Sequence, residues 1–183
     1  MTKFRQQLNL IHVGFIAKGI LVGLLSGLIV SLFRFLIEHS LIFWQFAYQK
    51  MHQNIWWGAL VILILLLIGL INMKLIHQQP HIMGSGIPEV ETQLGGNLKL
   101  QWWPVLWRKF IGGALAIGSG LFLGREGPSI QLGSSIGQGV ATGLKEKGTN
   151  ERVLIASGAA SGLAAAFNAP IAGTMFVLEE IYH

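Results

Sequence analysis

The stretch Leu121-Phe122-Leu123-Gly124-Arg125-Glu126-Gly127-Pro128-Ser129-Ile130 contains the feature that decides the fold. An apolar run stops at Gly124, and Gly127-Pro128 opens a second, glycine-spaced segment. Proline favours the first helical position, so Pro128 predicts a helix start. The unpaired N–H groups and partial positive charge of a helix N-terminus bind anions. Inside a bilayer the carboxylate of Glu126 would be costly, and this indicates a functional role.

The composition favours a membrane protein. Of the 183 residues, 52% are hydrophobic and 11% are charged, whereas soluble domains carry about 25% charged residues. The net charge of +5 could suggest a nucleic-acid partner, but the basic residues are scattered singly between long apolar runs. This pattern excludes nucleic acid as a partner and indicates a lipid bilayer. The absence of cysteine removes disulfide and thiolate chemistry.

The first third of the chain predicts two transmembrane helices. The apolar stretch at residues 11–37 is too long for the hydrophobic region of a signal peptide and is interpreted as the first span. Residues 38–55 predict a polar and aromatic turnaround, with Trp44 at interfacial depth. Residues 56–73 carry no charge and form the second span, and a loop follows at residues 77–80.

The rest of the chain predicts shorter, interrupted helices. Residues 83–90 form a glycine-rich lead into a Pro-initiated helix that Gly95-Gly96-Asn97 ends. The segments that follow are an amphipathic stretch at a headgroup layer (98–109), an apolar run (110–123), helices with small-xxx-small spacing (128–143 and 153–167) and a short last helix that Asn168-Ala169-Pro170 opens.

Two of these interruptions, at residues 84–88 and 124–128, each direct a helix N-terminus into the protein. Short hydrophobic segments broken by Gly and Pro are typical of discontinuous transporter helices that meet near the bilayer midplane. Non-helical backbone at that depth must be buried or line a cavity. The sequence therefore predicts an all-α, polytopic membrane fold with tilted and re-entrant helices, one domain over residues 1–183, and an anion pathway at the breaks.

The distribution of basic residues predicts the orientation. With a cytoplasmic N-terminus and a re-entrant segment after Met83, nearly all basic loop residues lie inside and only Lys50 lies clearly outside. The residues placed inside are Lys3, Arg5, Lys74, Lys99, Arg108, Lys109, Lys145, Lys147 and Arg152. We therefore expect a multi-pass protein of the cell membrane.

Two side chains at the breaks are candidate functional groups. Ser85 can donate its hydroxyl to an anion without a full positive charge, which permits fast release; alternatively it is an ordinary N-cap. Glu126, between flexible glycines, would occupy the anion site as a carboxylate and withdraw when protonated. Alternatively it pairs with Arg125, although adjacent helical residues point to different faces.

Other motifs carry weaker signals. Glu179 and Glu180 end the last helix, where the dipole disfavours carboxylates, and this argues against a purely structural role; alternatively they are solvated acids at headgroup level. Gly133-Ser134-Ser135-Ile136-Gly137 matches the G-x-S-x-G nucleophile pattern, which requires a preceding strand and His and acid partners. Because it lies in a predicted membrane helix, we expect no enzyme. No His/Glu spacing suggests a metal site, and no cofactor is expected.

Several motifs of this sequence resemble those of a known protein family. Gly84-Ser85-Gly86-Ile87-Pro88 and Gly124-Arg125-Glu126-Gly127-Pro128 resemble the first two signature motifs of the CLC family of chloride channels and chloride/proton exchangers. Asn168-Ala169-Pro170 and the segment 176–180 are similar to the segments that follow in that family.

The resemblance implies roles for individual residues. Ser85 would be the central chloride-coordinating serine, Glu126 the external gating glutamate and Glu180 the internal proton-transfer glutamate of exchangers. The anion site would be built from Gly84, Ser85, Gly86, Ile87, Pro88, Gly124, Arg125, Gly127 and Pro128, with backbone N–H groups near Arg125 and Gly127 lining its outer part. The family implies a homodimer in which each subunit has its own pathway.

The family is built from two inverted halves, and this chain resembles only the first, bacterial-type half. The second half's anion-binding backbone and coordinating tyrosine are absent, so a C-terminal half in the same or another chain would have to complete the site. We expect chloride/proton antiport. The alternatives are a passive chloride channel subunit and a non-transporting membrane scaffold or fragment.

Overall fold

The computed structural model describes residues 2–51 and 54–181, and within this part every regular element is a helix. The elements are α1 (Thr2–Met51), α2 (Ile55–Gln78), the 3₁₀ turn η1 (Pro80–Ile82), α3 (Ile87–Leu94), α4 (Trp102–Gly118), α5 (Glu126–Gly143), α6 (Thr149–Phe167) and α7 (Pro170–Ile181). The predicted all-α fold is confirmed.

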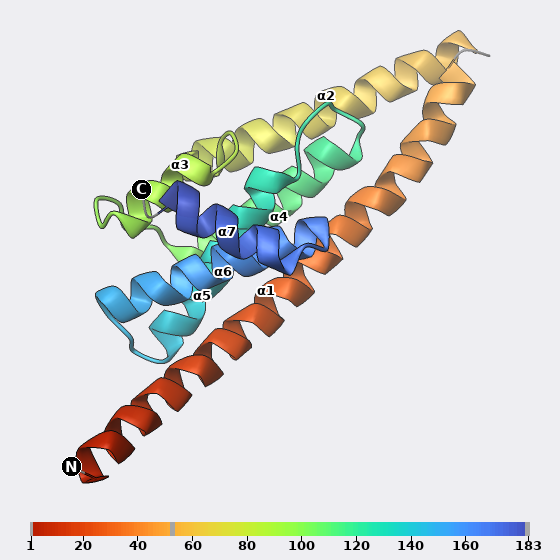
Figure 1. Ribbon diagram of the computed structural model, residues 1–183. Coiled ribbons are helices and arrows are strands. Elements are labelled where there is room, and N and C mark those ends of the chain that lie inside the picture. Colours follow the sequence, from red (N-terminus) through yellow and green to blue (C-terminus); the bar gives the residue numbers. More distant parts are fainter. Residues whose placement is uncertain (1, 52–53, 182–183) are drawn as a thin grey trace.

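Helices α1 and α2 form a long antiparallel hairpin that frames the shorter helices (Figure 1). The predicted turnaround at residues 38–55 is wrong, because α1 continues without a break to Met51. No Gly or Pro lies between Gly27 and Gly58 to stop it. Trp44, expected at an interface, is buried and packs with Val61 of α2 instead. Packing against α2 therefore extends the helix through a polar stretch.

Both hairpin helices are long and apolar enough to cross a membrane, over Gly14–Met51 and Ile55–Gln78. Their outward faces leave large apolar side chains exposed, including Leu24, Leu28, Leu66 and Leu70. A 50-residue helix is about 75 Å long, against a hydrocarbon layer of about 30 Å. Helix α1 must therefore tilt or extend beyond that layer.

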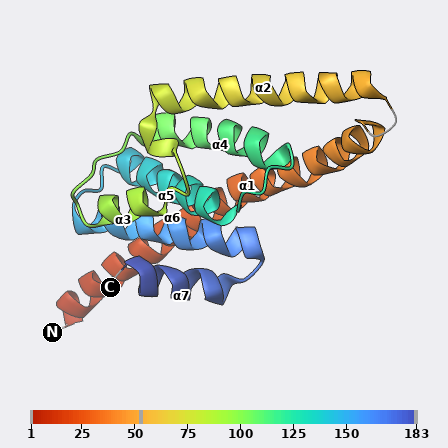
Figure 2. The same cartoon turned by 90° about the horizontal axis from the view of Figure 1, so that it is seen from above.

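The remaining helices stack in a row under α2. Figure 2 shows α2, α4, α5, α6 and α7 side by side in this order. The α5–α6 pair packs most closely, since a Cβ at Gly133 or Gly158 would overlap the other helix's backbone. The predicted small-residue interface is thus confirmed, and it places α5 at the centre, where residues 127–138 are all buried.

Most of the short helices begin and end close to their predicted positions, but α6, predicted from residue 153, already begins at Thr149. Helix α3 has 8 residues and ends before Gly95, while Asn168 adopts φ 55° as the left-handed cap that ends α6. Pro170 is the first residue of α7. The two key prolines sit slightly deeper than expected, because α3 starts at Ile87 and α5 starts two residues before Pro128.

Candidate functional site

The two helix breaks meet. Gly127, in the first turn of α5, packs directly on Ser85, and a Cβ there would lie 2.6 Å from both the Cβ and the carbonyl oxygen of Ser85. Ser85 and Glu126 line the same cavity of about 510 Å³. The two helix starts therefore meet at one cavity, as the sequence predicted. Their contact depends on Gly127, which has no side chain to keep the two backbones apart.

Most of the predicted anion-site residues line this cavity. Its wall contains Gly84, Ser85, Ile87, Gly124, Glu126, Gly127 and Pro128, together with Arg108 and Lys109 of α4. Gly86, Pro88 and Arg125 do not line it. Two cations and one carboxylate thus face a cavity whose remaining wall is mostly apolar, which is an environment that attracts a small anion.

The loop that carries Ser85 has a fixed backbone form. Gly84 and Gly86 both adopt left-handed φ angles, of 66° and 86°, which glycine tolerates and other residues resist. The Ser85 Oγ accepts a hydrogen bond from the backbone N–H of Ile87 at 3.3 Å. This is the N-cap-like contact that we considered as an alternative. Because the oxygen is the acceptor there, the hydroxyl proton remains available for donation to an anion.

Lys109 holds this loop from the side of α4. Its side chain is buried, and Nζ donates to the carbonyl oxygens of Ile82 at 2.9 Å and Gly84 at 2.8 Å. The sequence prediction that placed Lys109 at a headgroup layer is wrong. Its helical spacing from Val105 and Gly112, which are also buried, is the signal that could have placed it on the inward face.

Gln131 holds the same loop from α5. Its fully buried side chain donates from Nε2 to the carbonyl oxygen of His81 at 2.7 Å and fills the space beside Gly86. Sequence reasoning missed this residue, since a glutamine in a membrane helix has no pattern that names its partner. With Lys109, it fixes three loop carbonyls from two different helices.

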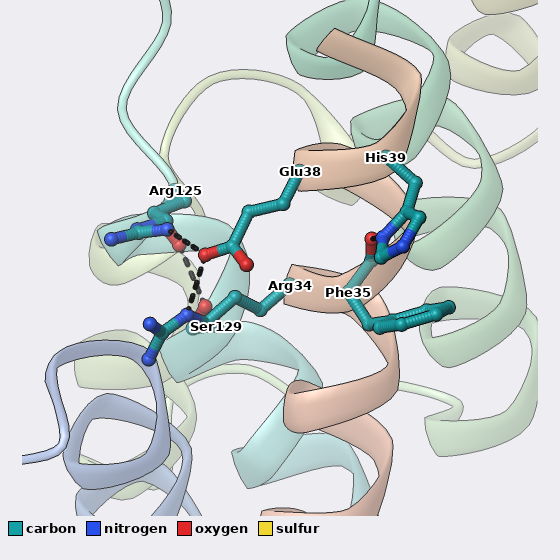
Figure 3. Close-up of polar contacts among 6 residues, drawn as sticks. All are labelled: Arg34, Phe35, Glu38, His39, Arg125 and Ser129. Atoms are coloured by element: carbon teal, nitrogen blue, oxygen red, sulfur yellow. Dashed lines mark hydrogen bonds and ion pairs between the residues drawn. The ribbon is translucent and has the colours of Figure 1, made fainter. Parts of the chain in front are cut away.

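Arg125, next to Glu126, is engaged elsewhere. Figure 3 shows the Glu38 carboxylate between two guanidinium groups. Glu38 Oε1 accepts from Arg34 Nε at 2.8 Å and from Arg125 Nη1 at 3.2 Å. The alternative of a local Arg125–Glu126 pair is therefore wrong. Arg125 links the start of α5 to α1, and Ser129 Oγ donates to the Arg125 carbonyl at 2.7 Å to close the first turn.

Glu126 is exposed and, among the described residues, forms no salt bridge. It is the first residue of α5, so its own backbone N–H and that of Gly127 have no hydrogen-bond acceptor within the helix. A carboxylate next to free N–H groups at a helix start is stabilised by the local dipole. A bound anion would be stabilised by the same groups.

Several predicted candidates lie away from this cavity. Glu179 is exposed near the end of α7, and the side chain of Glu180 lies outside the described part of the chain. Ser134 and Ser135 donate to the Gln131 carbonyl within α5, at 3.0 and 2.8 Å, so the G-x-S-x-G segment is ordinary helix. Within the described residues, no group of His and Glu is arranged to hold a metal.

The fold combines long apolar helices with short, interrupted ones, and the N-termini of two short helices share one cavity. This combination defines a membrane protein of the transporter and channel class. The family model described as voltage gated chloride channel matches residues 66–183. The chain belongs to this family, the CLC family, and corresponds to its N-terminal portion.

Curated relatives are similar over most of this chain. An H(+)/Cl(−) exchange transporter ClcA of Vibrio cholerae is 41% identical over 168 residues, which cover 89% of this chain and 36% of the relative. The protein of the same name from Vibrio parahaemolyticus is 48% identical over 129 residues, which cover 69% of this chain and 27% of the relative. The matched part of this chain thus spans 36% and 27% of the length of these two transporters.

Solved structures agree on the fold. The crystal structure of a slow cyanobacterial Cl−/H+ antiporter superposes with a TM-score of 0.82 at 37% identity, over 92% of this chain and 40% of that one. A CLC-type fluoride/proton antiporter superposes with a TM-score of 0.74 at 24% identity, over 91% of this chain and 40% of that one; this second match bears on fold alone.

Proposed function

We propose that this chain forms the first half of a chloride/proton antiporter, with Ser85 and Glu126 at the pathway. The observation that carries the proposal is the direct packing of Gly127 on Ser85, which places two helix starts and one acid at a single cavity. The relatives named H(+)/Cl(−) exchange transporters support chloride and protons as the transported ions.

In this proposal, uncharged hydrogen-bond donors bind chloride directly, and charged side chains contribute only through the electrostatic potential of the cavity. The Ser85 hydroxyl and the N–H groups of Glu126 and Gly127 donate to the anion. The Lys109 ammonium donates to two carbonyls but still contributes its positive charge to the cavity. A site without a direct lysine contact binds chloride and also releases it quickly.

Proton coupling rests on two states of Glu126. As a carboxylate it is an anion beside free N–H groups and competes with chloride for them. When protonated it loses that attraction and the anion enters. Glu180 would exchange the proton with the opposite side of the membrane. Each chloride passage is thereby tied to a protonation event, which is the requirement for antiport.

The proposal includes a partner for this chain. The matched transporters are more than twice as long as this chain. A C-terminal half, in the same or another chain, would supply the remaining ligands. We further propose a homodimer in the cell membrane, as a single membrane domain with a cytoplasmic N-terminus that follows the bias of the basic residues.

Glu126→Gln tests the proposal, in liposomes that contain the chain together with its C-terminal half. Glutamine keeps the shape but neither ionises nor carries a proton. Chloride flux should persist while chloride-driven proton flux falls to background. Glu151→Gln, which removes an acid that does not line this cavity, is the matched control and should keep both fluxes.

Two results separate the alternatives. A passive channel would show chloride flux without proton flux already in the unsubstituted protein. A membrane scaffold would show neither flux, or fluxes that Glu126→Gln leaves unchanged, and that outcome would refute the role of Glu126.

A further inference from the structure

A second cavity, of about 600 Å³, lies away from the Ser85–Glu126 site. It is formed by the α3–α4 loop, the α5–α6 loop and the first turns of α6, and both loops lie at the same end of the bundle (Figure 2). None of its residues lines the first cavity. Its function is therefore a separate question from transport.

The charged groups of this cavity are mostly positive. Lys99, Lys147 and Arg152 line it, against one carboxylate, Glu151. Within the described part of the chain none of the three cations forms a salt bridge. Three cations from two loops and a helix, against a single carboxylate, give the cavity a net positive charge that suits a polyvalent anion.

Arg152 is held in position by the backbone beside it. Gly96 adopts φ 83°, and a Cβ on it would overlap the Arg152 guanidinium. The guanidinium therefore occupies the space that a side chain at Gly96 would fill. An arginine whose planar head is already positioned loses little freedom when it binds two oxygens of a phosphate.

Gln93 supplies an independent indication of a ligand. It lines the cavity and is only 7% exposed, and its Nε2 is buried without a hydrogen-bond partner. An unsatisfied buried donor is costly, and a ligand oxygen would remove that cost. The first N–H groups of α6, which starts at Thr149, add further donors at the same cavity.

Apolar side chains complete the wall, including Leu98, Leu100 and Ile155. We infer that this cavity binds the phosphate group of an amphipathic anion, with Arg152, Lys99 and Lys147 on the phosphate oxygens and the leucines against its carbon skeleton. Basic pockets between membrane helices bind anionic lipid headgroups in this way. A soluble phosphate ester offers the same chemistry.

The test measures binding to the full-length protein in detergent by isothermal titration calorimetry. The probes are dioctanoyl phosphatidylglycerol, glycerol 3-phosphate and, as a zwitterionic control, dioctanoyl phosphatidylcholine. Phosphatidylglycerol should bind at least ten times more tightly than phosphatidylcholine. Arg152→Gln and Lys147→Gln should each weaken binding about tenfold, the equivalent of one charge-assisted hydrogen bond.

Lys145→Gln is the matched control, since Lys145 belongs to the same loop but does not line the cavity. It removes the same charge and should change affinity less than twofold. A melting temperature for each variant shows that the fold is retained. Tighter binding of glycerol 3-phosphate than of phosphatidylglycerol would support the site and assign it to a soluble ester.

Two results would overturn the inference. One is equal affinity for phosphatidylglycerol and phosphatidylcholine with no binding of glycerol 3-phosphate. The other is a loss of affinity in Lys145→Gln as large as in Lys147→Gln, which would mean that general surface charge, and not this cavity, attracts the anion.

Discussion

At the scale of single residues, the pathway depends on a glycine and a lysine that the motifs do not explain by themselves. Gly127 allows α5 to contact the Ser85 backbone, and Lys109 fixes the carbonyls of Ile82 and Gly84, which directly precede Ser85 in the chain. The absent side chain of Gly127 and the ammonium group of Lys109 both act on Ser85, whereas the backbone N–H of Gly127 is the separate donor that we propose for the anion. They are positioning residues, and each can be tested by a substitution that leaves the proposed ligands in place.

Gly127→Ala should displace Ser85. The added methyl group would lie 2.6 Å from Ser85 atoms, and such overpacking costs about 1–3 kcal/mol. We expect a lower melting temperature in detergent and roughly tenfold weaker chloride binding in the complete protein, measured by calorimetry. Gly143→Ala has open space around it and should change neither quantity. Unchanged chloride affinity in Gly127→Ala would contradict the role of this contact.

Lys109→Met should loosen the Ser85 turn. Methionine keeps the apolar stem but leaves the carbonyls of Ile82 and Gly84 without their donor, at about 1–3 kcal/mol for an unsatisfied buried group. Chloride flux should fall at least tenfold, together with the melting temperature. Lys74→Met removes an exposed lysine of α2 and serves as the control. Normal flux in Lys109→Met would show that the turn holds its form without the clamp.

At the scale of elements, the start of α5 is tied to α1 through Glu38. This ion pair is partly exposed, so solvent screens it and its contribution to stability is small. The ion pair mainly fixes the position of the Arg125 guanidinium, which it holds beside α1. The long helix, whose extension past residue 37 the sequence did not predict, is what brings Glu38 to the pathway.

Glu38→Gln should therefore alter chloride flux more than stability. Once Arg125 is released from Glu38, the first turn of α5, which lines the cavity, loses its tie to α1. Chloride flux should then fall, with the melting temperature nearly unchanged. The measurement is chloride flux in liposomes with a C-terminal half. A flux identical to that of the unsubstituted protein, or to that of the control Glu91→Gln, would exclude this coupling.

At the scale of the whole molecule, a contact across 128 residues joins the α5–α6 loop to α1. Lys18 Nζ donates to Glu146 at 2.5 Å, and Asn150 also donates to that carboxylate. The hydrogen bond from Lys18, with a smaller one from Asn150, holds the pKa of Glu146 below its usual value. A depressed carboxyl pKa stabilises the fold above the unfolded-state pKa, and this stabilisation is lost as the pH falls through the folded-state pKa.

The pH dependence of stability should reflect this pair. Between pH 7 and pH values below the ordinary glutamate pKa of about 4.3, the melting temperature in detergent should fall. Glu146→Gln should lower the melting temperature at pH 7 and flatten its decline on acidification. Glu151→Gln is the control. An unchanged decline in Glu146→Gln would show that other carboxylates dominate acid sensitivity.

The sequence by itself determined the class of fold, the two helix breaks, the end of α3, the end of α6 and the start of α7. These follow from local rules, since Gly and Pro fix backbone angles and long apolar runs require lipid. It did not determine where α1 ends, that Arg125 pairs with Glu38, or that Lys109 and Gln131 hold the Ser85 turn. Those depend on which side chains meet across helices distant in sequence, and only close packing in three dimensions decides that.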